Sequence, residues 1–309
     1  MAENTLTSNQ ILEALSKMLS EETISGGTGS NPQANNSGVP TDENLSLPEI
    51  YQQLASPSLA RSVLHVQKLH GPTGALFNIK KKDAEDAIEL LRNDVEVYPS
   101  EPIKTGITQE VLDDIFAQYG QNGLYNVAVL LRGLANNAEN DKLFEWLEDV
   151  AVDTSRALTL SNQTNAIDNF YELNQFVSEE VLKMNLAGVR TYRASVILPY
   201  KLAASVLGVN GVLSTGNATK SEFYVGGTSF VKYFVHTDPA ATNGYIILHD
   251  EILPTSSAGV ISPYQDQLQL VQNSEDGQYN VLIYNRFAIK ESPLHTASNP
   301  MITKFVSPL

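Results

Sequence analysis

The stretch from Thr108 to Val152 constrains the fold of this chain more than any other, because it lacks proline and repeats apolar residues at helical spacing. Its first part predicts a helix with Thr108 as the N-cap and Gly120 at its end. Its second part predicts a helix of about 25–30 residues, roughly 40 Å long. The apolar positions of this second helix are Leu124, Val127, Leu131, Leu134, Ala138, Leu143, Trp146, Leu147 and Val150. Gly133 and the pair Asn136–Asn137 leave a kink open within it. A helix this long is unusual against a mean of about 11–12 residues.

The chain before this helix combines short elements with a long polar segment. Apolar residues at helical spacing predict a helix over residues 8–21. Residues 22–46 are rich in Gly, Ser and Asn and contain no aromatic residue, so they bury too little apolar area to offset the entropy cost of ordering. We therefore expect a flexible segment there, followed by a short helix from Leu47, a turn at 71–74 and a strand at 75–80. Segment 80–94 carries helix formers with apolar residues on one side, and we expect it to be helical.

The chain after the long helix changes from helical to β-rich. Residues 168–189 predict a further helix, and the apolar strand 195–198 runs into a helix with Pro199 in its first turn. Several strands follow, and a polar loop between residues 230–237 and 245–250 predicts a β-hairpin. Because the predicted helices lie mostly early in the chain and the predicted strands late, the sequence indicates an α+β fold.

Composition narrows the function classes. The 309 residues carry 35 acidic against 20 basic side chains, a net charge of −15, which argues against a protein whose task is to grip phosphate backbones. The absence of cysteine excludes disulfides, thiolate metal sites and thiol nucleophiles. No apolar run approaches the roughly 20 residues that span a bilayer, and the N-terminus lacks the features of a signal peptide. We therefore expect a chain made in a cytoplasm, with no membrane partner.

Catalytic and cofactor motifs are not evident. The glycine-rich run in 25–30 follows no strand and lacks the lysine of a P-loop, so a linker is the better interpretation. His236 and His249, with Asp238, Asp250 and Glu251 nearby, could form a metal site on the predicted hairpin. The alternative is that these are polar residues at strand ends. We expect no catalytic residue, no metal and no cofactor, and hence no enzyme.

The basic residues Lys80, Lys81 and Lys82 form the single basic cluster, directly before an acidic run. One interpretation is a solvated loop with local helix pairs. The other is a charged clasp that meets an acidic partner surface, for which the acidic long helix of another copy is suitable. Together with Arg92, these lysines are the candidate residues for contact between subunits.

Three segments in succession resemble the tailed-phage major capsid proteins of the T-even-like branch. The first is SPSLARSVLHVQKLHGPTGALFNIK (56–80), in which the GPTG turn precedes a short apolar strand leading into an extended loop. The second, residues 108–147, is similar to the family's spine-helix region, with a short helix, a small-residue break and then the long helix. The third is the C-terminal part from residue 244 on, where Ile261-Ser262-Pro263-Tyr264 precedes the closing strands.

This resemblance implies an α+β, HK97-like capsid fold with an N-terminal arm, an extended loop, a peripheral domain bearing the spine helix, and an axial domain. Mapped onto this chain, the arm is residues 1–74, with 22–46 flexible, and the extended loop is 75–106. The peripheral domain is then 107–207 with 264–309, and the axial domain is 208–263.

The function implied is that of a major capsid protein in a virion. Such subunits form hexamers and pentamers in an icosahedral shell around double-stranded DNA, which touches the inner face without sequence specificity. Portal, scaffold and decoration proteins are further expected partners. Three alternatives stay open: a vertex (pentamer) subunit, an encapsulin-type compartment shell, and an α+β enzyme whose site is scattered along the sequence.

Overall fold

The computed structural model describes residues 45–54, 57–81, 88–98, 102–154, 157–160, 165–188, 193–206, 224–227, 230–249, 257–272 and 279–307. The predicted helix over 8–21 and nearly all of the segment 22–46 lie outside these residues. The chain falls into two compact units. The first comprises the described parts of Met1–Ser56, Tyr98–Asn137 and Gln265–Arg286, and the second those of Pro57–Val97, Ala138–Tyr264 and Phe287–Leu309.

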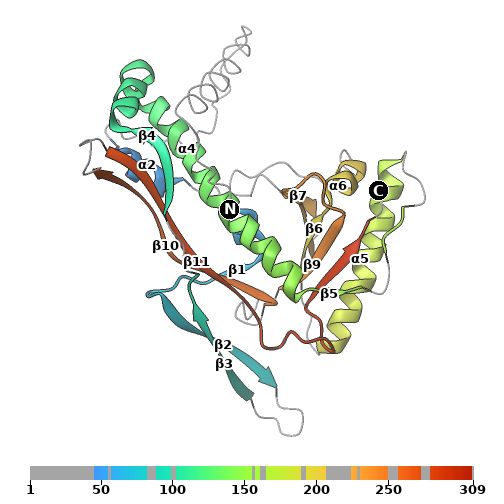
Figure 1. Ribbon diagram of the computed structural model, residues 1–309. Helices are drawn as coiled ribbons and strands as arrows, with labels where there is room; N and C mark the ends of the chain where they lie inside the picture. The colour runs from blue at the N-terminus through green and yellow to red at the C-terminus, as the bar shows by residue number, and fades with distance from the viewer. Residues whose placement is uncertain are drawn as a thin grey trace, which may run out of the picture. The chain divides into compact units, whose positions relative to one another are not determined.

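Helix α4 (Gln109–Val150) confirms the long proline-free helix (Figure 1). The Thr108 hydroxyl accepts a hydrogen bond from the Val111 amide at 3.4 Å, as expected of the N-cap. Gly120, at φ 60° and ψ −146°, interrupts the helical backbone, so the break falls where the sequence predicted the first helix to end. This conformation is open almost only to glycine. The kink left open near Gly133 does not form, because Gly120 is the one non-helical residue inside α4.

The first unit is built around the N-terminal part of α4. Helix α2 (Leu47–Gln53) begins at Ser46, where Ser46 and Glu49 form a capping box. Strand β4 (Ile103–Thr108) pairs antiparallel with β11 (Tyr279–Glu291), which neighbours β10 (Gly259–Gln272). The core of this unit is made of apolar residues from all of these elements: Leu47, Ile50, Tyr51, Ile107, Leu112, Ile115, Val127, Ala128, Leu131, Ala135, Leu268, Val281 and Ile283.

The second unit contains a six-stranded sheet in the order β5-β12-β9-β6-β8-β7. Its strands are β5 (Val152–Asp153), β12 (Ile302–Val306), β9 (Asn243–His249), β6 (Arg193–Leu198), β8 (Val231–Val235) and β7 (Tyr224–Gly227). Strand β6 pairs parallel with β8 and antiparallel with β9. The predicted β8–β9 hairpin is therefore wrong. Because all residues of β6 after Arg193 are buried, this apolar strand takes a central place between the two.

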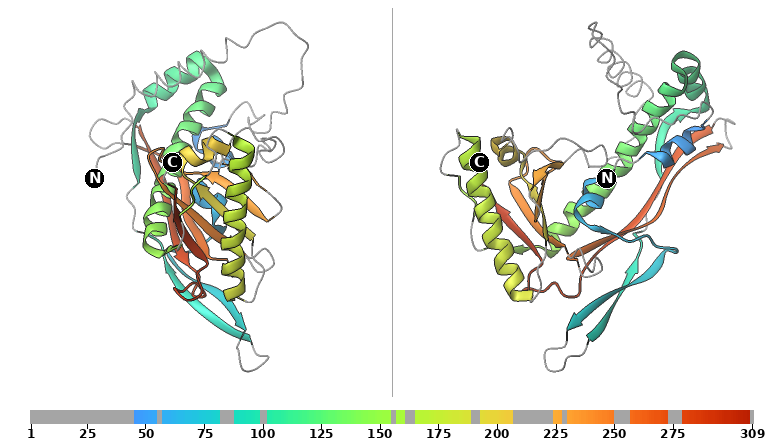
Figure 2. Two further views of the ribbon diagram at one scale, coloured as in Figure 1. Left: turned by 90° about the vertical axis from the view of Figure 1, so that its right-hand side faces the viewer. Right: turned by 180° about the vertical axis from the view of Figure 1, so that it is seen from behind.

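Helix α5 (Ala166–Gly188) covers one face of this sheet (Figures 1 and 2). Phe305 of β12 meets Phe176 of α5 edge to face at 5.3 Å between ring centroids. Gly244 of β9 lies opposite Phe305 in the register, and a Cβ atom there would come within 2.3 Å of its ring. The glycine therefore makes room for the aromatic contact. The short helix α6 (Tyr200–Val206) follows β6 through Pro199 as predicted, and it is held to α5 by a bond from the Asn169 amide to the Ser205 carbonyl.

Strands β2 (Thr73–Lys81) and β3 (Ile88–Glu96) form a separate two-stranded antiparallel sheet, which belongs to the second unit. Figure 1 shows this ribbon extending away from β1 (His65–Val66), the strand that precedes it in the chain. The predicted helix in 80–94 is wrong, because Ile88 onward is a strand paired with β2 in a register from Thr73↔Glu96 to Lys81↔Ile88. Pairing with β2 outweighs the local helix preference, which is worth only tenths of a kcal/mol per residue.

Candidate functional site

The β2–β3 ribbon contains most of the residues that the sequence proposed for subunit contact. Lys80 and Lys81 are the last residues of β2, where the register places them opposite Glu89 and Ile88. Lys82 lies outside the described residues. Arg92, on β3, is exposed and forms an ion pair with Asp94 at 2.7 Å between Nε and Oδ1. Since both side chains are mostly exposed, this pair contributes little to stability and leaves the ribbon's surface charged.

The base of the ribbon is anchored within the second unit. The Asn93 side-chain amide donates to the Glu291 carbonyl at 2.9 Å, and the Val97 amide donates to the Pro72 carbonyl at 2.9 Å. A small apolar cluster lies at the base, made of Leu69, Val95, Val97, Val260 and Ala288. The ribbon is thus fixed at this end, and its two strands pair with no other described strand.

A buried ion pair holds α4 within the second unit. The Glu139 side chain is 1% exposed and accepts hydrogen bonds from the Arg61 Nε at 2.9 and 3.0 Å and from the Ser58 hydroxyl. Arg61 belongs to the short helix α3 (Leu59–Val63), which Ser58 caps. The neighbouring Asn140 accepts from the Ala60 amide. The carboxylate therefore joins α3 to α4 and positions the chain that leads into β1 and the ribbon.

The first unit has its own charged anchor. Arg132 of α4 binds both oxygens of Asp266 on β10, at 2.7 and 2.8 Å. The Tyr51 hydroxyl donates to the same carboxylate at 3.3 Å, and the Arg132 guanidinium lies 5.2 Å from the Tyr51 ring centroid. Burial, together with the charge of Asp266, raises the pKa of Tyr51 to about 12. The phenol stays neutral and links α2 to α4 and β10.

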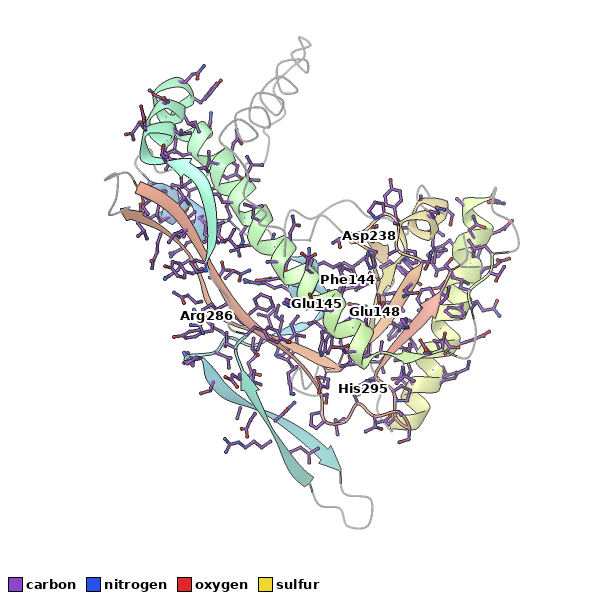
Figure 3. The ribbon with its side chains drawn as sticks, viewed as in Figure 1. Phe144, Glu145, Glu148, Asp238, Arg286 and His295 are labelled. Carbon is purple, nitrogen blue, oxygen red and sulfur yellow. The ribbon has the colours of Figure 1, made fainter. Side chains whose placement is uncertain are left out.

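Near its C-terminal end, α4 contacts the six-stranded sheet through Glu148 (Figure 3). Its carboxylate accepts from the Tyr245 hydroxyl, from the Asn243 amide at 3.0 Å and from Lys304 at 3.1 Å. The bond from Tyr245 is the main reason that the pKa of Glu148 lies below its ordinary value. The bond to Glu148 likewise raises the pKa of Lys304. This face of the sheet is the one opposite α5, because Tyr245 and Lys304 alternate with the residues that face α5.

The two histidines of the proposed metal site are both engaged within the protein. The ring of His236 stacks on Phe144 at 3.8 Å, and its Nδ1 accepts from the Asp238 amide at 2.9 Å. His249 lies on another strand, with Nε2 at 2.6 Å from the Ser195 hydroxyl. No group of three His, Cys, Asp or Glu side chains within the described ranges could hold a metal ion. Asp250 and Glu251 lie outside the described residues.

Ser195 and His249 are as close as a catalytic serine and its general base, so we asked whether the pair could be catalytic. Ser195 is 1% exposed within the central strand, which keeps a substrate from its hydroxyl. Burial first, and then the charges of Lys232 and His65, lower the pKa of His249 to about 4. A catalytic histidine needs a carboxylate that stabilises its cation, and these neighbours act in the opposite direction. The pair is better explained as a hydrogen bond that satisfies two polar groups of the sheet.

Sequence reasoning missed two exposed surfaces of the second unit. Three large apolar residues on α5 are mostly exposed: Ile167 at 53%, Tyr171 at 66% and Leu182 at 58%. Phe230, directly before β8, is 62% exposed. The signal was present in the sequence, because α5 carries apolar residues around most of its circumference whereas a one-sided surface helix carries a single stripe.

Comparison with solved structures identifies the fold. The crystal structure of a virus-like particle from Pyrococcus furiosus matches with a TM-score of 0.50 at 15% identity, over 81% of this chain and 92% of that chain. The fold is HK97-like. The holo-SrpI encapsulin complex from Synechococcus elongatus PCC 7942 matches with a TM-score of 0.47 at 10% identity, over 93% of this chain and 94% of that chain. A protein of Mycobacterium phage Che8 matches with a TM-score of 0.46 at 12% identity, over 90% of this chain and 98% of that chain.

The HK97-like fold confirms the expected fold class. No protein-family model matches the sequence, and no curated protein matches it. The T-even-like branch therefore stays a prediction that rests on sequence motifs. Within the described part of the chain, no helix is both long and apolar enough to cross a membrane.

Proposed function

We propose that this chain is the major capsid protein of a tailed phage, of the T-even-like branch. It assembles as hexamers and pentamers into an icosahedral shell around double-stranded DNA. The observation that carries the proposal is the HK97-like fold, matched over most of the chain by a protein of a virus-like particle. The succession of the GPTG turn, the broken spine helix and the closing strands supports the phage branch. Portal, scaffold and decoration proteins are the further partners of such a shell.

The domain plan is part of the proposal. Residues 1–74 are the arm, 75–106 the extended loop, 107–207 with 264–309 the peripheral domain, and 208–263 the axial domain. The β2–β3 ribbon supports the second segment, since its two strands account for half of 75–106 and pair with no other described strand. The six-stranded sheet takes strands from both sides of the 207/208 boundary, so that boundary marks a place in the sequence and not a break in the sheet.

The ribbon is proposed to clasp a neighbouring copy. Lys80, Lys81, Lys82 and Arg92 would meet acidic residues of that copy's long helix, whose exposed carboxylates include Asp141, Glu145 and Asp149 of α4. Opposite charges on two copies favour encounter and fix the register of assembly more than they add affinity.

Expression of the chain followed by negative-stain microscopy tests the shell. Uniform hollow particles are the expected result, and a monomeric elution profile with saturable binding of a small molecule would favour the scattered-site enzyme instead. The contents of nuclease-treated particles separate two shell types, since protected DNA supports a phage capsid and a protein cargo an encapsulin-type compartment. Particles in which the chain occupies only fivefold positions would favour a vertex subunit.

A deletion tests the clasp. Removing residues 80–92 leaves the pairs from Thr73↔Glu96 to Leu76↔Asn93 and the anchors at the base of the ribbon. The subunits should therefore remain folded by circular dichroism, while shell formation is lost. Alanine at Lys80, Lys81 and Lys82 is the milder companion variant, which removes the charges and keeps the ribbon. Normal shells from the deletion variant would show that the clasp is not needed.

A further inference from the structure

The exposed residues Ile167, Tyr171 and Leu182, here called the α5 stripe, share one face of their helix. Their spacings of four and eleven residues bring them to the same side, together with the exposed Gln175 and Ser178. The opposite side of α5 is already covered, since Leu173 and Phe176 are buried against the sheet. Helix α5 thus has two apolar sides, and the described residues of the chain cover only one of them.

An acidic margin runs along the α5 stripe. Asp168 is exposed beside Ile167, and Glu172 and Glu179 are half-exposed further along the same side of the helix. On the same helix, Lys183 pairs with Glu180 at 2.6 Å. An occupant of the α5 stripe therefore meets an apolar centre with negative charge along one edge.

A second exposed surface has the opposite charge. Arg193 begins β6, Lys232 lies in β8, and both are exposed. Phe230 lies close to both, because it precedes Lys232 by two residues and its carbonyl accepts a hydrogen bond at 2.9 Å from the amide of Ala194, the neighbour of Arg193. We call Arg193, Phe230 and Lys232 the strand-end patch. It presents a large exposed aromatic ring and two exposed cationic side chains.

The two surfaces lie on opposite sides of the six-stranded sheet. Tyr233 faces α5, since its hydroxyl donates to Asn174 at 3.2 Å and its ring meets Phe170 edge to face. Side chains alternate along a strand, so the adjacent Lys232 points to the other face. Its electrostatic effect on His249, whose ring bonds Ser195 on that face, agrees with this placement.

We propose that the α5 stripe of one copy packs on the strand-end patch of the next, and that repetition of this contact closes the ring of a capsomer. In a ring, each subunit contacts its two neighbours through two different complementary surfaces. The two patches match in apolar character, are opposite in charge and lie on opposite sides of one sheet. The inference rests on the proposed shell function and names the surface through which copies meet.

Cysteine cross-linking tests this contact directly, because the chain has no cysteine of its own. The double variant Tyr171→Cys/Phe230→Cys, assembled and treated with a short bis-maleimide, should give a ladder of covalent oligomers up to pentamer and hexamer. Each single variant should give none. The matched control is Tyr171→Cys/Tyr200→Cys, because Tyr200 is also exposed but lies on α6, which packs beside α5. A ladder from the control, dimers from either single variant, or intact shells without a ladder would each overturn the contact.

A charge exchange gives an independent readout. Lys232→Glu and Asp168→Lys should each lower the yield of shells at least about tenfold, and the variant carrying both should recover most of that loss, since opposite charges again meet across copies. Circular dichroism of the unassembled subunits separates misfolding from failed assembly. A double variant no better than the worse single variant would overturn the pairing. If the unaltered chain forms no shells, the shell proposal itself fails, which is a distinct result.

Discussion

Replacement of Glu139 by alanine perturbs the contact that holds α4 within the second unit. The Glu139 side chain is 1% exposed, and its partner Arg61 is 15% exposed. Removing the carboxylate takes the negative charge of Glu139 away from a nearly buried guanidinium and removes the acceptor of the Ser58 hydroxyl. Breaking a buried ion pair in this way costs about 3–5 kcal/mol. We therefore expect the free energy of unfolding of this unit to fall by about that amount.

The protein provides a local probe for this measurement. Trp146 is the one tryptophan of the chain, is 7% exposed and belongs to the second unit. Urea unfolding of unassembled subunits, followed by its fluorescence, therefore reports on that unit. The matched control is Lys142→Ala, which breaks an exposed ion pair with Glu145 on the same helix and should cost less than about 1 kcal/mol.

Two outcomes decide whether the reasoning holds. A Glu139→Ala variant no less stable than the Lys142→Ala control would refute it, because burial would then add nothing to the pair. The combined variant Arg61→Met/Glu139→Leu should recover much of the lost stability, since it removes both charges together and fills the space with apolar atoms.

Three further predictions concern single positions. Gly120→Ala should lower the free energy of unfolding by about 1–3 kcal/mol, because a residue with a Cβ is strained at φ 60° and ψ −146°. Gly133→Ala should raise it by about 0.5–1 kcal/mol, because Gly133 has a helical backbone and open space for a Cβ. Thermal unfolding followed by circular dichroism measures both changes. Gly244→Ala should destabilise the second unit by about 1–3 kcal/mol, because its Cβ would overlap the Phe305 ring. Adding Phe305→Leu to the same chain should restore part of the lost stability, as measured by unfolding followed by Trp fluorescence. The pKa of His249 is lowered to about 4, so the unfolded state binds a proton that the folded state does not between pH 4 and about 6.5. Stability should therefore fall as the pH drops through this window, and His249→Phe should flatten the dependence; an unchanged slope would contradict the assignment.

Local signals predicted the helices α4, α5 and α6. The capping threonine and the terminal glycine set the limits of the first helix in α4, because both act within a few residues of the chain. The helix α5 and the β6–α6 junction at Pro199 were predictable for the same reason. Segment 80–94 was not, since its strand depends on β2, and the partner strand is not visible in local helix preference.

The candidate site was only partly predictable. The basic residues near the far end of the ribbon were visible as a cluster of charge, and their role in contact stays a prediction. The α5 stripe and the strand-end patch were not found, because exposure depends on which sides of α5 and β8 the sheet covers. The predicted metal site required β8 and β9 to be neighbours in a hairpin. In the structure, β6 lies between these two strands.

The sequence by itself determined the long broken helix, the α+β class and, through the order of its motifs, the expectation of an HK97-like fold. The helix and the class follow from spacing, capping and chain order, whereas the HK97-like fold was implied by the resemblance to phage capsid proteins. Only the tertiary structure decided that β6 separates β8 from β9, that residues 88–96 pair as a strand, and that the described residues leave one apolar side of α5 uncovered. Each of these depends on contacts between residues far apart in the chain, where the burial of one surface decides which other surfaces remain exposed.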